Sequence, residues 1–269
     1  KTKEYGCQGV ELVLDDKTPD GSTPVEYAKA LTVHANEQGL EVPIYTTGAN
    51  FFVKEPEKEL ERLCRHIDIA AECKIPLLRH DVAWGYYEGY TGIKSYKKVI
   101  EAVAPLVRQA AEYARERGVK TCSENHGYLL QDSVRMLELF AAVDHPNYGF
   151  LCDMGNFTVV DEDCATAVSA LSDYIVHVHA KDMLVRSGMN FDPGRGYNLS
   201  RGGNYWRGTI FGHGNVPTFQ ILSAIRKSGY DGYVSLEFEG MEPVLEGVEI
   251  GTQNLQHMIE VIGEGQRYV

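Results

Sequence analysis

Short apolar runs rich in β-branched and aliphatic residues recur along the chain, and each is followed by a longer stretch with helical spacing of its apolar positions. Such a run predicts a buried strand, and the stretch after it predicts an amphipathic helix. Strands that alternate with helices are typical of a parallel sheet with right-handed crossovers. The pattern predicts seven strands, over residues 9–14, 42–46, 75–79, 119–123, 148–152, 174–179 and 233–238.

Seven helices are expected to connect and follow these strands. Several open with proline or a capping residue and close before glycine, which supplies the left-handed turn at the end of a helix. This joint recurs at Gly39, Gly118 and Gly229. The predicted helices cover residues 24–38, 56–73, 95–117, 132–143, 162–171, 217–227 and 243–262.

The fold class follows from the strand count. A closed TIM (β/α)8 barrel has eight parallel strands, one more than the pattern predicts. The opening segment has the same helix, glycine and strand form as the internal joints, so we expect a TIM (β/α)8-type barrel whose first strand and helix are missing from the sequence. Residues 9–14 would then take the second strand position and pair with residues 42–46 on one side. An open doubly wound sheet, or a first strand hidden in another segment, is the alternative.

Domain organisation is predicted from what the sequence lacks. No Pro/Ser-rich or single-charge stretch divides the 269 residues. We therefore expect a single barrel domain over residues 1–269, with one long βα loop at about residues 183–216.

Charge and composition exclude several partners. With 26 basic and 38 acidic residues the formal net charge is −12, and no Lys/Arg-rich run stands out, which argues against nucleic acid. The six cysteines are scattered without a C-x-x-C pair and are expected to be reduced. No apolar stretch approaches the roughly 18 residues needed to span a bilayer, and the first residues have no signal-peptide core. A soluble, cytoplasmic protein with no membrane partner is expected.

Four later strands end on residue types that bind metals, namely Glu124, Asp153, His179 and Glu237. The first three are 29 and 26 residues apart, one β/α unit each, so their side chains are predicted to meet at the carboxyl face of the barrel. Three carboxylates repel one another unless a cation neutralises them. We therefore predict one divalent cation. Three oxygen ligands and one imidazole favour Mn²⁺, with Mg²⁺, Co²⁺ or Zn²⁺ as alternatives.

Each of these four residues also has a structural alternative. A lone acidic residue at a strand end is more often a helix cap or an ion-pair partner, and Asp153 could cap the turn that follows it. His177 and His179 lie on the same face of one strand because side chains alternate. His179, nearer the rim, is assigned to the metal, and His177 is expected to be a hydrogen-bonded neighbour.

Short motifs at these strand ends resemble the xylose-isomerase-like (β/α)8 superfamily of sugar phosphate isomerases and epimerases, over residues 6 to about 262. That superfamily also contains inosose dehydratases, hydroxypyruvate isomerases and endonuclease IV nucleases. The resemblance implies that Glu124 and Glu237 both bind the cation and exchange the substrate proton, on a small carbohydrate substrate. The motifs are Ser123-Glu124-Asn125-His126-Gly127, Cys152-Asp153-Met154-Gly155-Asn156, His177-Val178-His179-Ala180-Lys181-Asp182, Gly212-His213-Gly214-Asn215-Val216-Pro217 and Gly232-Tyr233-Val234-Ser235-Leu236-Glu237.

Two departures from the ketose 3-epimerases of this superfamily bear on the substrate. Asn156 stands where they usually have histidine, and residues 183–211 are far longer than their corresponding loop. A simple free-ketose 3-epimerase is therefore not expected. The loop is aromatic and basic, so it either covers a carboxylated, phosphorylated or glycosidic substrate or forms a homo-oligomer contact. Candidate substrate-binding residues, each of which could instead be structural, are His126, Asn156, Lys181, Arg186 and His213.

The predicted chemistry is removal of a proton next to a carbonyl. Returning the proton to the opposite face gives an epimer, and returning it to the adjacent carbon gives an isomer, so an isomerase or epimerase is expected. Loss of a β-hydroxyl instead makes a dehydratase of the inosose dehydratase type, which is the second hypothesis. An endonuclease IV-like nuclease would need more ligands and a less acidic surface. A non-catalytic binding protein would hold the metal without turnover.

Overall fold

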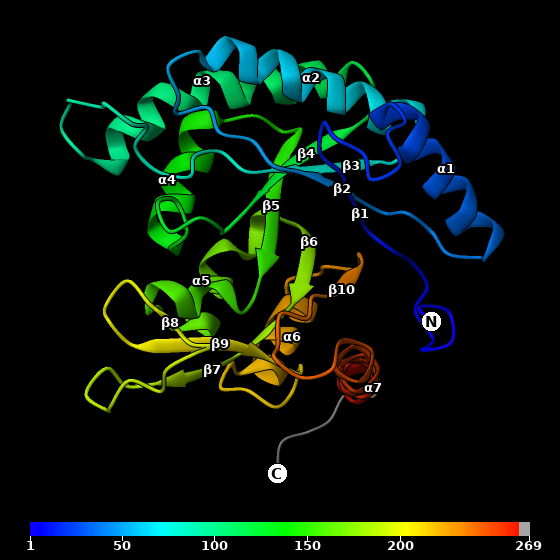
Figure 1. The fold of residues 1–269 in the computed structure, drawn as a ribbon, viewed down its shortest axis with the longest axis vertical. Coiled ribbons are helices and arrows are strands. Elements are labelled where there is room, and N and C mark those ends of the chain that lie inside the picture. Colours follow the sequence, from blue (N-terminus) through cyan, green and yellow to red (C-terminus); the bar gives the residue numbers. More distant parts are fainter. Residues whose placement is uncertain (264–269) are drawn as a thin grey trace. The chain divides into compact units, whose positions relative to one another are not determined.

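Seven parallel strands form the main sheet of this protein, in the order β1-β2-β3-β4-β5-β6-β10 (Figure 1). The structure is a computed structural model, and it describes residues 1–263. Each strand overlaps one of the seven predicted strands, so the predicted parallel α/β architecture is confirmed. The strands are β1 (Leu12–Val13), β2 (Tyr45–Thr47), β3 (Leu77–His80), β4 (Lys120–Glu124), β5 (Tyr148–Asp153), β6 (Ile175–Ala180) and β10 (Val234–Leu236).

Strand β1 has the predicted neighbour. Leu12 pairs with Tyr45 and Val13 with Thr46 in a parallel register, and an isolated bridge joins Gly9 to Glu41. Within residues 1–263, β1 and β10 stand at the two ends of the strand order. The pairing of residues 9–14 with residues 42–46 on one side is therefore confirmed.

The chain divides into two compact units. The first comprises Lys1–Leu130 and Val134–Phe150, and the second comprises Gln131–Ser133 and the chain from Leu151 onward. The boundary falls within β5, so the first half of this strand belongs to the first unit and the second half to the second unit.

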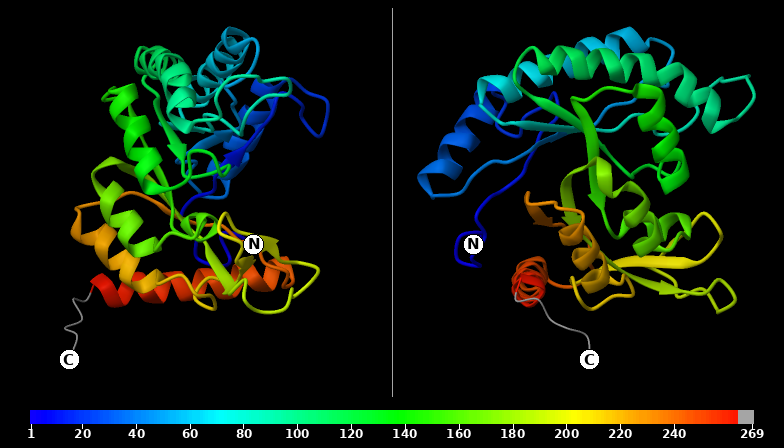
Figure 2. Two further views of the ribbon diagram at one scale, coloured as in Figure 1. Left: turned by 90° about the vertical axis from the view of Figure 1, so that its left-hand side faces the viewer. Right: turned by 180° about the vertical axis from the view of Figure 1, so that it is seen from behind.

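Helices α1 (Pro24–Glu37), α2 (Pro56–Glu72), α3 (Tyr96–Arg115) and α4 (Ser133–Val143) follow the strands of the first unit. Thr23 and Glu26 form a capping box that fixes the start of α1, because each side chain accepts from the backbone of the other. Helix α2 packs against both α1 and α3, and Figures 1 and 2 show α2 and α3 side by side. Leu63 and Leu78 are fully buried in this unit.

In the second unit, α5 (Cys164–Leu171) packs on α6 (Thr218–Lys227), which packs in turn on α7 (Val244–Gly263). Two 3-10 helices, η1 (Asn156–Val160) and η2 (Ser172–Tyr174), flank α5. Each of the seven predicted helices is present, with ends shifted by a few residues. No described helix is long and apolar enough to cross a membrane.

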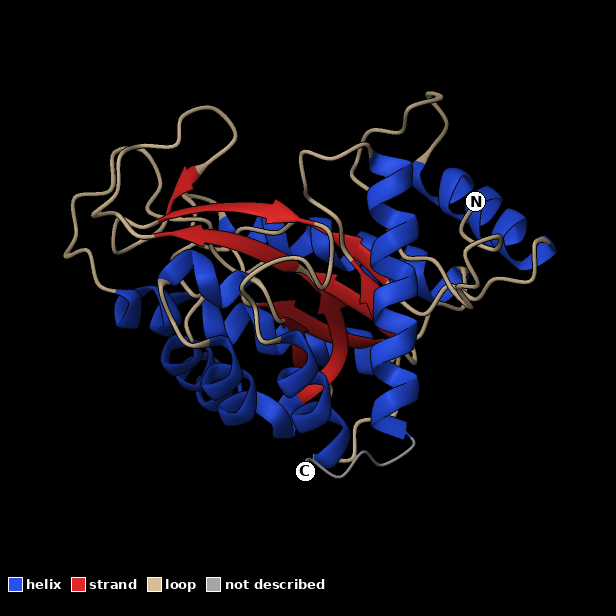
Figure 3. Cartoon of the chain, turned by 90° about the horizontal axis from the view of Figure 1, so that it is seen from below, coloured by secondary structure: helices blue, strands red, loops and turns tan. Residues whose placement is uncertain are grey.

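The predicted long loop after β6 contains a second sheet. Strands β7 (Asp182–Arg186), β8 (Asn198–Leu199) and β9 (Tyr205–Thr209) form an antiparallel sheet in the order β7-β9-β8. Figure 3 shows all strands in red. The register sets Leu184 opposite Arg207 and Arg186 opposite Tyr205. We refer to residues 183–211 as the insertion. Its strands were not predicted, because they are short and are separated by many turn-forming residues.

Candidate metal centre

Asp153 is the last residue of β5, and its side chain is completely buried. Its Oδ1 accepts from the backbone N–H groups of Gly155, at 2.8 Å, and Asn156, at 2.9 Å. The alternative role as a turn cap is therefore present. The carboxylate also has a second contact, since its Oδ2 lies 3.0 Å from Nζ of Lys181. One oxygen thus orders the turn, and the other faces the buried ammonium group of Lys181.

His179 and Glu237 come from neighbouring strands, since Ser235 of β10 pairs with His179 of β6. His179 Nδ1 lies 3.0 Å from Glu237 Oε2. Burial disfavours the charged form of Glu237, but the hydrogen bond with His179 and the charge of Lys181 hold its pKa well below the usual range. His177 is hydrogen-bonded to Ser235 Oγ at 2.9 Å, as expected for a neighbour on the same strand face.

Lys181 lies between the carboxylates of the second unit. Its Nζ is 3.0 Å from Asp153, 2.9 Å from Glu237 and 3.3 Å from Glu239. It also donates to Asn156 Oδ1 at 3.4 Å, and its side chain is only 3% exposed. A buried ammonium needs such compensation. Lys181, which was expected to bind substrate, is therefore also the counter-ion of these carboxylates. We refer to Lys181, Asp153, His179, Glu237 and Glu239 as the Lys181 cluster.

The donors of the Lys181 cluster fit a divalent cation. Asp153, His179 and Glu237 each offer one ligand atom, and these atoms lie within 4.8 Å of one another. Three carboxylates lie within 3.3 Å of one ammonium group, and one of them, Asp153, is completely buried. A hard divalent cation takes oxygen and imidazole ligands of this kind.

Glu124, the fourth predicted ligand, is the last residue of β4 in the first unit and is buried. Its Oε2 accepts from Nε of Arg79 at 3.0 Å and from Nη2 at 2.6 Å. Burial works against the Arg79 charge, but Glu124 and Asp81 raise the pKa of the guanidinium above its usual value. Glu124 is therefore held in a fixed position by a permanent cation.

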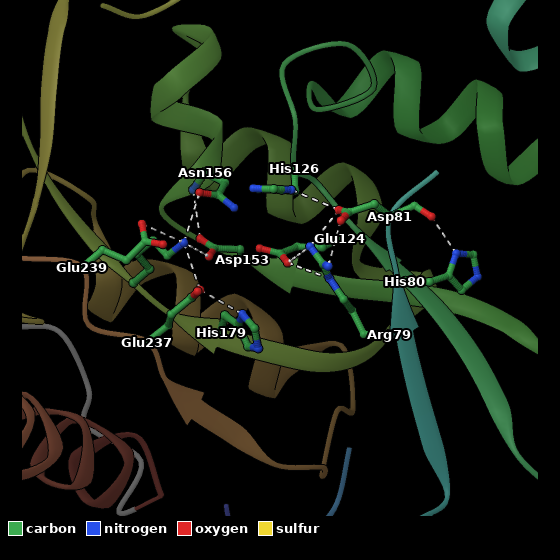
Figure 4. Close-up of polar contacts among 11 residues, drawn as sticks. Arg79, His80, Asp81, Glu124, His126, Asp153, Asn156, His179, Glu237 and Glu239 are labelled. Carbon is green, nitrogen blue, oxygen red and sulfur yellow. Dashed lines mark hydrogen bonds and ion pairs between the residues drawn. The ribbon is translucent and has the colours of Figure 1, made fainter. Parts of the chain in front are cut away.

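Asp81 links this arginine to His126. Arg79 Nη1 donates to Asp81 Oδ2 at 3.1 Å, and His126 Nδ1 lies 3.0 Å from Asp81 Oδ1. The hydrogen bond with Asp81 raises the pKa of His126. His126 remains half exposed, and its backbone N–H donates to Glu124 O. The first unit therefore presents a connected row of polar groups where β3 and β4 end (Figure 4).

The other predicted substrate-binding residues are placed differently. Asn156 is buried at the start of η1, and its backbone carbonyl accepts from Gln131 at 2.6 Å. Arg186 is exposed at the end of β7, and His213 is exposed in the turn that follows the insertion.

Comparison with known proteins defines the family. A family model for the xylose isomerase-like TIM barrel matches residues 1–262. The chain belongs to this family. It is 28% identical over 142 residues to an inosose dehydratase of Lacticaseibacillus casei, a match that covers 52% of the chain and 47% of the relative. The chain thus aligns with about half the length of the curated relatives it matches.

Solved structures agree on the fold of this xylose isomerase-like barrel. A xylose isomerase domain protein of Planctomyces limnophilus superposes with a TM-score of 0.75 at 16% identity, over 97% of the chain and 92% of its own. A xylose isomerase-like TIM barrel protein of Mycobacterium smegmatis in complex with magnesium superposes with a TM-score of 0.70 at 17% identity, over 97% of the chain and 85% of its own. A D-allulose 3-epimerase of Methylomonas in complex with D-allulose superposes with a TM-score of 0.68 at 18% identity, over 96% of the chain and 88% of its own.

Two polar residues that contact the strand-end side chains of this xylose isomerase-like barrel were not among the predicted site residues. Arg79 and Asp81 stand at the end of β3, so the strand-end rule applied to the later strands would have found them. A further residue, Asp182, follows Lys181 directly. Its carboxylate accepts from the backbone N–H groups of Gly212, at 3.0 Å, and Gly214, at 2.7 Å.

Asp182 also accepts from the N–H groups of Met183, at 2.8 Å, and Val216, at 3.2 Å. One carboxylate therefore holds the whole turn that carries His213. A Cβ atom on Gly214 would lie 2.1 Å from Asp182 Oδ1, so this turn requires glycine.

Proposed function

We propose that this protein is a divalent-metal-dependent isomerase or epimerase that removes a proton next to the carbonyl of a sugar or sugar derivative. The observation that carries the proposal is the convergence of one ligand atom each from Asp153, His179 and Glu237, which lie within 4.8 Å of one another. We assign these three residues and Glu124 to one cation, with Mn²⁺ as first choice and Mg²⁺, Co²⁺ or Zn²⁺ as alternatives. The magnesium and the D-allulose bound by the structural neighbours support the assignment.

When bound, the cation would polarise the substrate carbonyl and acidify the adjacent C–H group. Glu237 lies beside His179 and Lys181, and we assign it to accept that proton once the cation has acidified the C–H group. Glu124, fixed by Arg79, is assigned as the second acid–base group: after it takes a proton from solvent it can deliver that proton to the substrate, while Glu237 releases the abstracted proton to solvent. Lys181 would donate a hydrogen bond to a substrate oxygen that carries developing negative charge.

A dehydratase is the second candidate, supported by the inosose dehydratase relatives. The first step is the same removal of a proton. The electron pair left on carbon then expels the β-hydroxyl group, which needs a proton to leave as water. His126 is the group near Glu124 suited to supply it.

Proton exchange in deuterated buffer tests the proposal directly. The Mn²⁺-loaded full chain would be incubated with D-allulose, D-fructose 6-phosphate and inosose, and deuterium incorporation would be followed by NMR and mass spectrometry. We expect incorporation next to the carbonyl of at least one compound. Glu124→Gln and Glu237→Gln should each abolish it, because an amide cannot accept the proton.

Metal content must be measured in both variants, and a matched control is Glu112→Gln, which changes a carboxylate paired with Arg115 and His145 on the first unit. Loss of water from inosose would favour the dehydratase. Undiminished exchange in both site variants, with metal retained, would exclude the two glutamates as bases.

A further inference from the structure

The insertion ends in a projecting turn whose two large apolar side chains are almost fully exposed. Met189 is 97% exposed and Phe191 is 96% exposed, although residues of these types are usually buried. Figures 1 and 2 show this segment, in yellow-green, extending past the end of β7. We refer to residues 187–197 as the tip of the insertion. Neighbouring apolar side chains exposed to this degree on a projecting turn indicate a surface that contacts another molecule.

Hydrogen bonds inside the tip order its backbone. Ser187 Oγ accepts from the N–H group of Met189 at 3.2 Å, and the Ser187 carbonyl oxygen accepts from that of Asn190 at 2.9 Å. Asp192 Oδ1 accepts from the N–H group of Gly194 at 2.7 Å. A turn that is already ordered loses little conformational entropy when it binds. The backbone that carries the two apolar side chains is therefore preorganised for a contact.

Side-chain contacts fasten the base of the insertion to the second unit. Arg201 donates to Asp132 Oδ2 at 2.6 Å. Asp161 accepts from Ser200 Oγ at 2.6 Å and from Asn204 Nδ2 at 2.7 Å. Asp161 itself adopts a left-handed backbone conformation at φ 60°, which a packed environment must hold in place. The base is therefore a fixed support for the tip.

The outer edge of β7 is already occupied. Asn215 Oδ1 accepts from the N–H group of Val185 at 2.8 Å, and the N–H group of Asn215 donates to Met183 O at 2.7 Å. A partner strand therefore cannot add to the sheet at these positions, and a partner of the insertion must bind through side chains. Asn215 also ties β7 to the segment that leads into α6.

An open groove on α6 begins directly after Asn215. Its volume is about 730 Å³, and its apolar lining includes Val216, Pro217, Phe219 and Ala224. Sites that enclose small molecules have volumes of about 300–1,000 Å³, so the groove has room for two large side chains. The second unit therefore carries both a projecting apolar surface and a receiving one.

The tip and the groove carry opposite charges. Asp192 follows Phe191 directly and is the only acidic residue of the insertion. Lys227 is the last residue of α6 and lines the groove. Both side chains are exposed, and neither forms an ion pair with another described residue. Opposite charges beside complementary apolar surfaces favour one orientation of two partners.

We propose that the tip of one copy of this chain binds in the α6 groove of a second copy, with Met189 and Phe191 in the groove and Asp192 beside Lys227. Because the same unit carries both surfaces, two copies can bind reciprocally about a twofold axis.

The arginines of the insertion favour the same occupant. The insertion contains four arginines and one aspartate, a formal charge of +3, whereas the whole chain has −12, so the remaining residues have −15. Arg186 and Arg195 are exposed. A second copy of this acidic chain is therefore attracted to the insertion more strongly than a neutral or basic partner.

The buried area decides between a single and a reciprocal contact. A large buried side chain covers about 200 Å², so Met189 and Phe191, with the groove surface that they cover, remove roughly 800 Å² from solvent. That is about the upper size of a crystal-packing contact. Two such contacts remove roughly 1,600 Å², the usual size of a specific interface. We therefore expect a symmetric dimer.

Sedimentation velocity of the full chain over a wide range of protein concentration tests the proposal. We expect twice the chain mass at high concentration. Phe191→Ser should raise the dimer dissociation constant about thirtyfold or more, because it truncates an aromatic side chain at the centre of the contact. The matched control is Ile93→Ser, which changes an 80% exposed apolar residue of the first unit and should leave the dissociation constant unchanged.

Charge reversal tests whether the groove receives the tip. Asp192→Lys and Lys227→Glu should each raise the dissociation constant about tenfold or more, and the double variant should return to within about threefold of the wild type, because the pair is restored with reversed signs. The changed residues are exposed, so the variants are expected to fold, and melting temperatures check this.

A chain that stays monomeric at every concentration would leave the tip to a different molecule and overturn the proposal. A dimer that survives Phe191→Ser, a double variant that stays dissociated, or a mass that grows beyond the dimer would overturn it as well. The mass is measured without substrate, so the result does not depend on the proposed reaction.

Discussion

Replacing Lys181 by methionine tests how much the buried ammonium group contributes to the free energy of unfolding. The variant keeps much of the side-chain volume but removes the ammonium group that lies 3.0 Å from Asp153, 2.9 Å from Glu237 and 3.3 Å from Glu239. Removing one partner of a buried ion pair costs about 3–5 kcal/mol. Glu237 and Glu239 are 34% and 51% exposed and can turn to solvent, whereas Asp153 is completely buried.

The lower end of that range, about 3 kcal/mol, is therefore expected, carried mainly by Asp153. For a chain of this size the loss corresponds to a fall of roughly 6–10 °C in melting temperature. The assay is thermal and urea unfolding in EDTA, with Lys29→Met as control, because Lys29 forms an exposed pair with Glu72. The control should unfold near the wild-type temperature.

Divalent metal should reverse the effect of this substitution. Without the ammonium group, Asp153 and Glu237 attract a cation more strongly, so Lys181→Met should bind Mn²⁺ at least tenfold more tightly, about 1.4 kcal/mol. At a concentration 100 times the dissociation constant the metal stabilises the folded state by about 2.7 kcal/mol. Wild-type stability of Lys181→Met in EDTA, or weaker metal binding by it, would refute this account of the cluster.

Three further predictions concern residues around the site. Arg79→Lys keeps the positive charge but loses the paired guanidinium donors that hold Glu124, so kcat should fall by about tenfold or more with metal content unchanged. A wild-type kcat would show that Arg79 does not position Glu124. Burial lowers the pKa of His80 to about 4, below the unfolded value near 6.5. The free energy of unfolding should therefore decrease as the pH falls from 6.5 towards 4, by about 3 kcal/mol at most. Urea unfolding of His80→Gln should show a weaker dependence of this free energy on pH, and an unchanged dependence would contradict the assignment. Asp182→Asn replaces an acceptor of four backbone N–H groups, so a loss of about 2–3 kcal/mol in unfolding free energy is expected, and a loss below 0.5 kcal/mol would contradict its role.

The strands and helices of the main sheet could be predicted because their signals are local. The apolar run over residues 148–152 is fully buried in β5, and the glycines after the helices have the left-handed conformation expected of them, as at Gly118, where φ is 72°. The sheet of the insertion could not be predicted in this way. Its pairing joins Asp182 to Thr209 across residues with turn-forming composition, and the fixing contacts of Asp161 lie about forty residues apart in sequence.

Part of the candidate site could also be predicted from local sequence signals. Strand ends selected Asp153, His179 and Glu237, which the second unit brings together. The role of Lys181 as their counter-ion could not be predicted, because it depends on a side chain reaching three carboxylates from two other strand ends. The hold of Arg79 on Glu124 likewise depends on the stagger between β3 and β4.

The central claim is that Asp153, His179 and Glu237 hold one divalent cation together with Glu124. Calorimetric titration of the EDTA-stripped full chain with Mn²⁺ tests it most directly, with the stoichiometry checked by elemental analysis. One ion per chain is predicted, and Asp153→Asn and Glu237→Gln should each weaken binding at least tenfold. Wild-type affinity in both variants, or no binding by the native chain, would contradict the account.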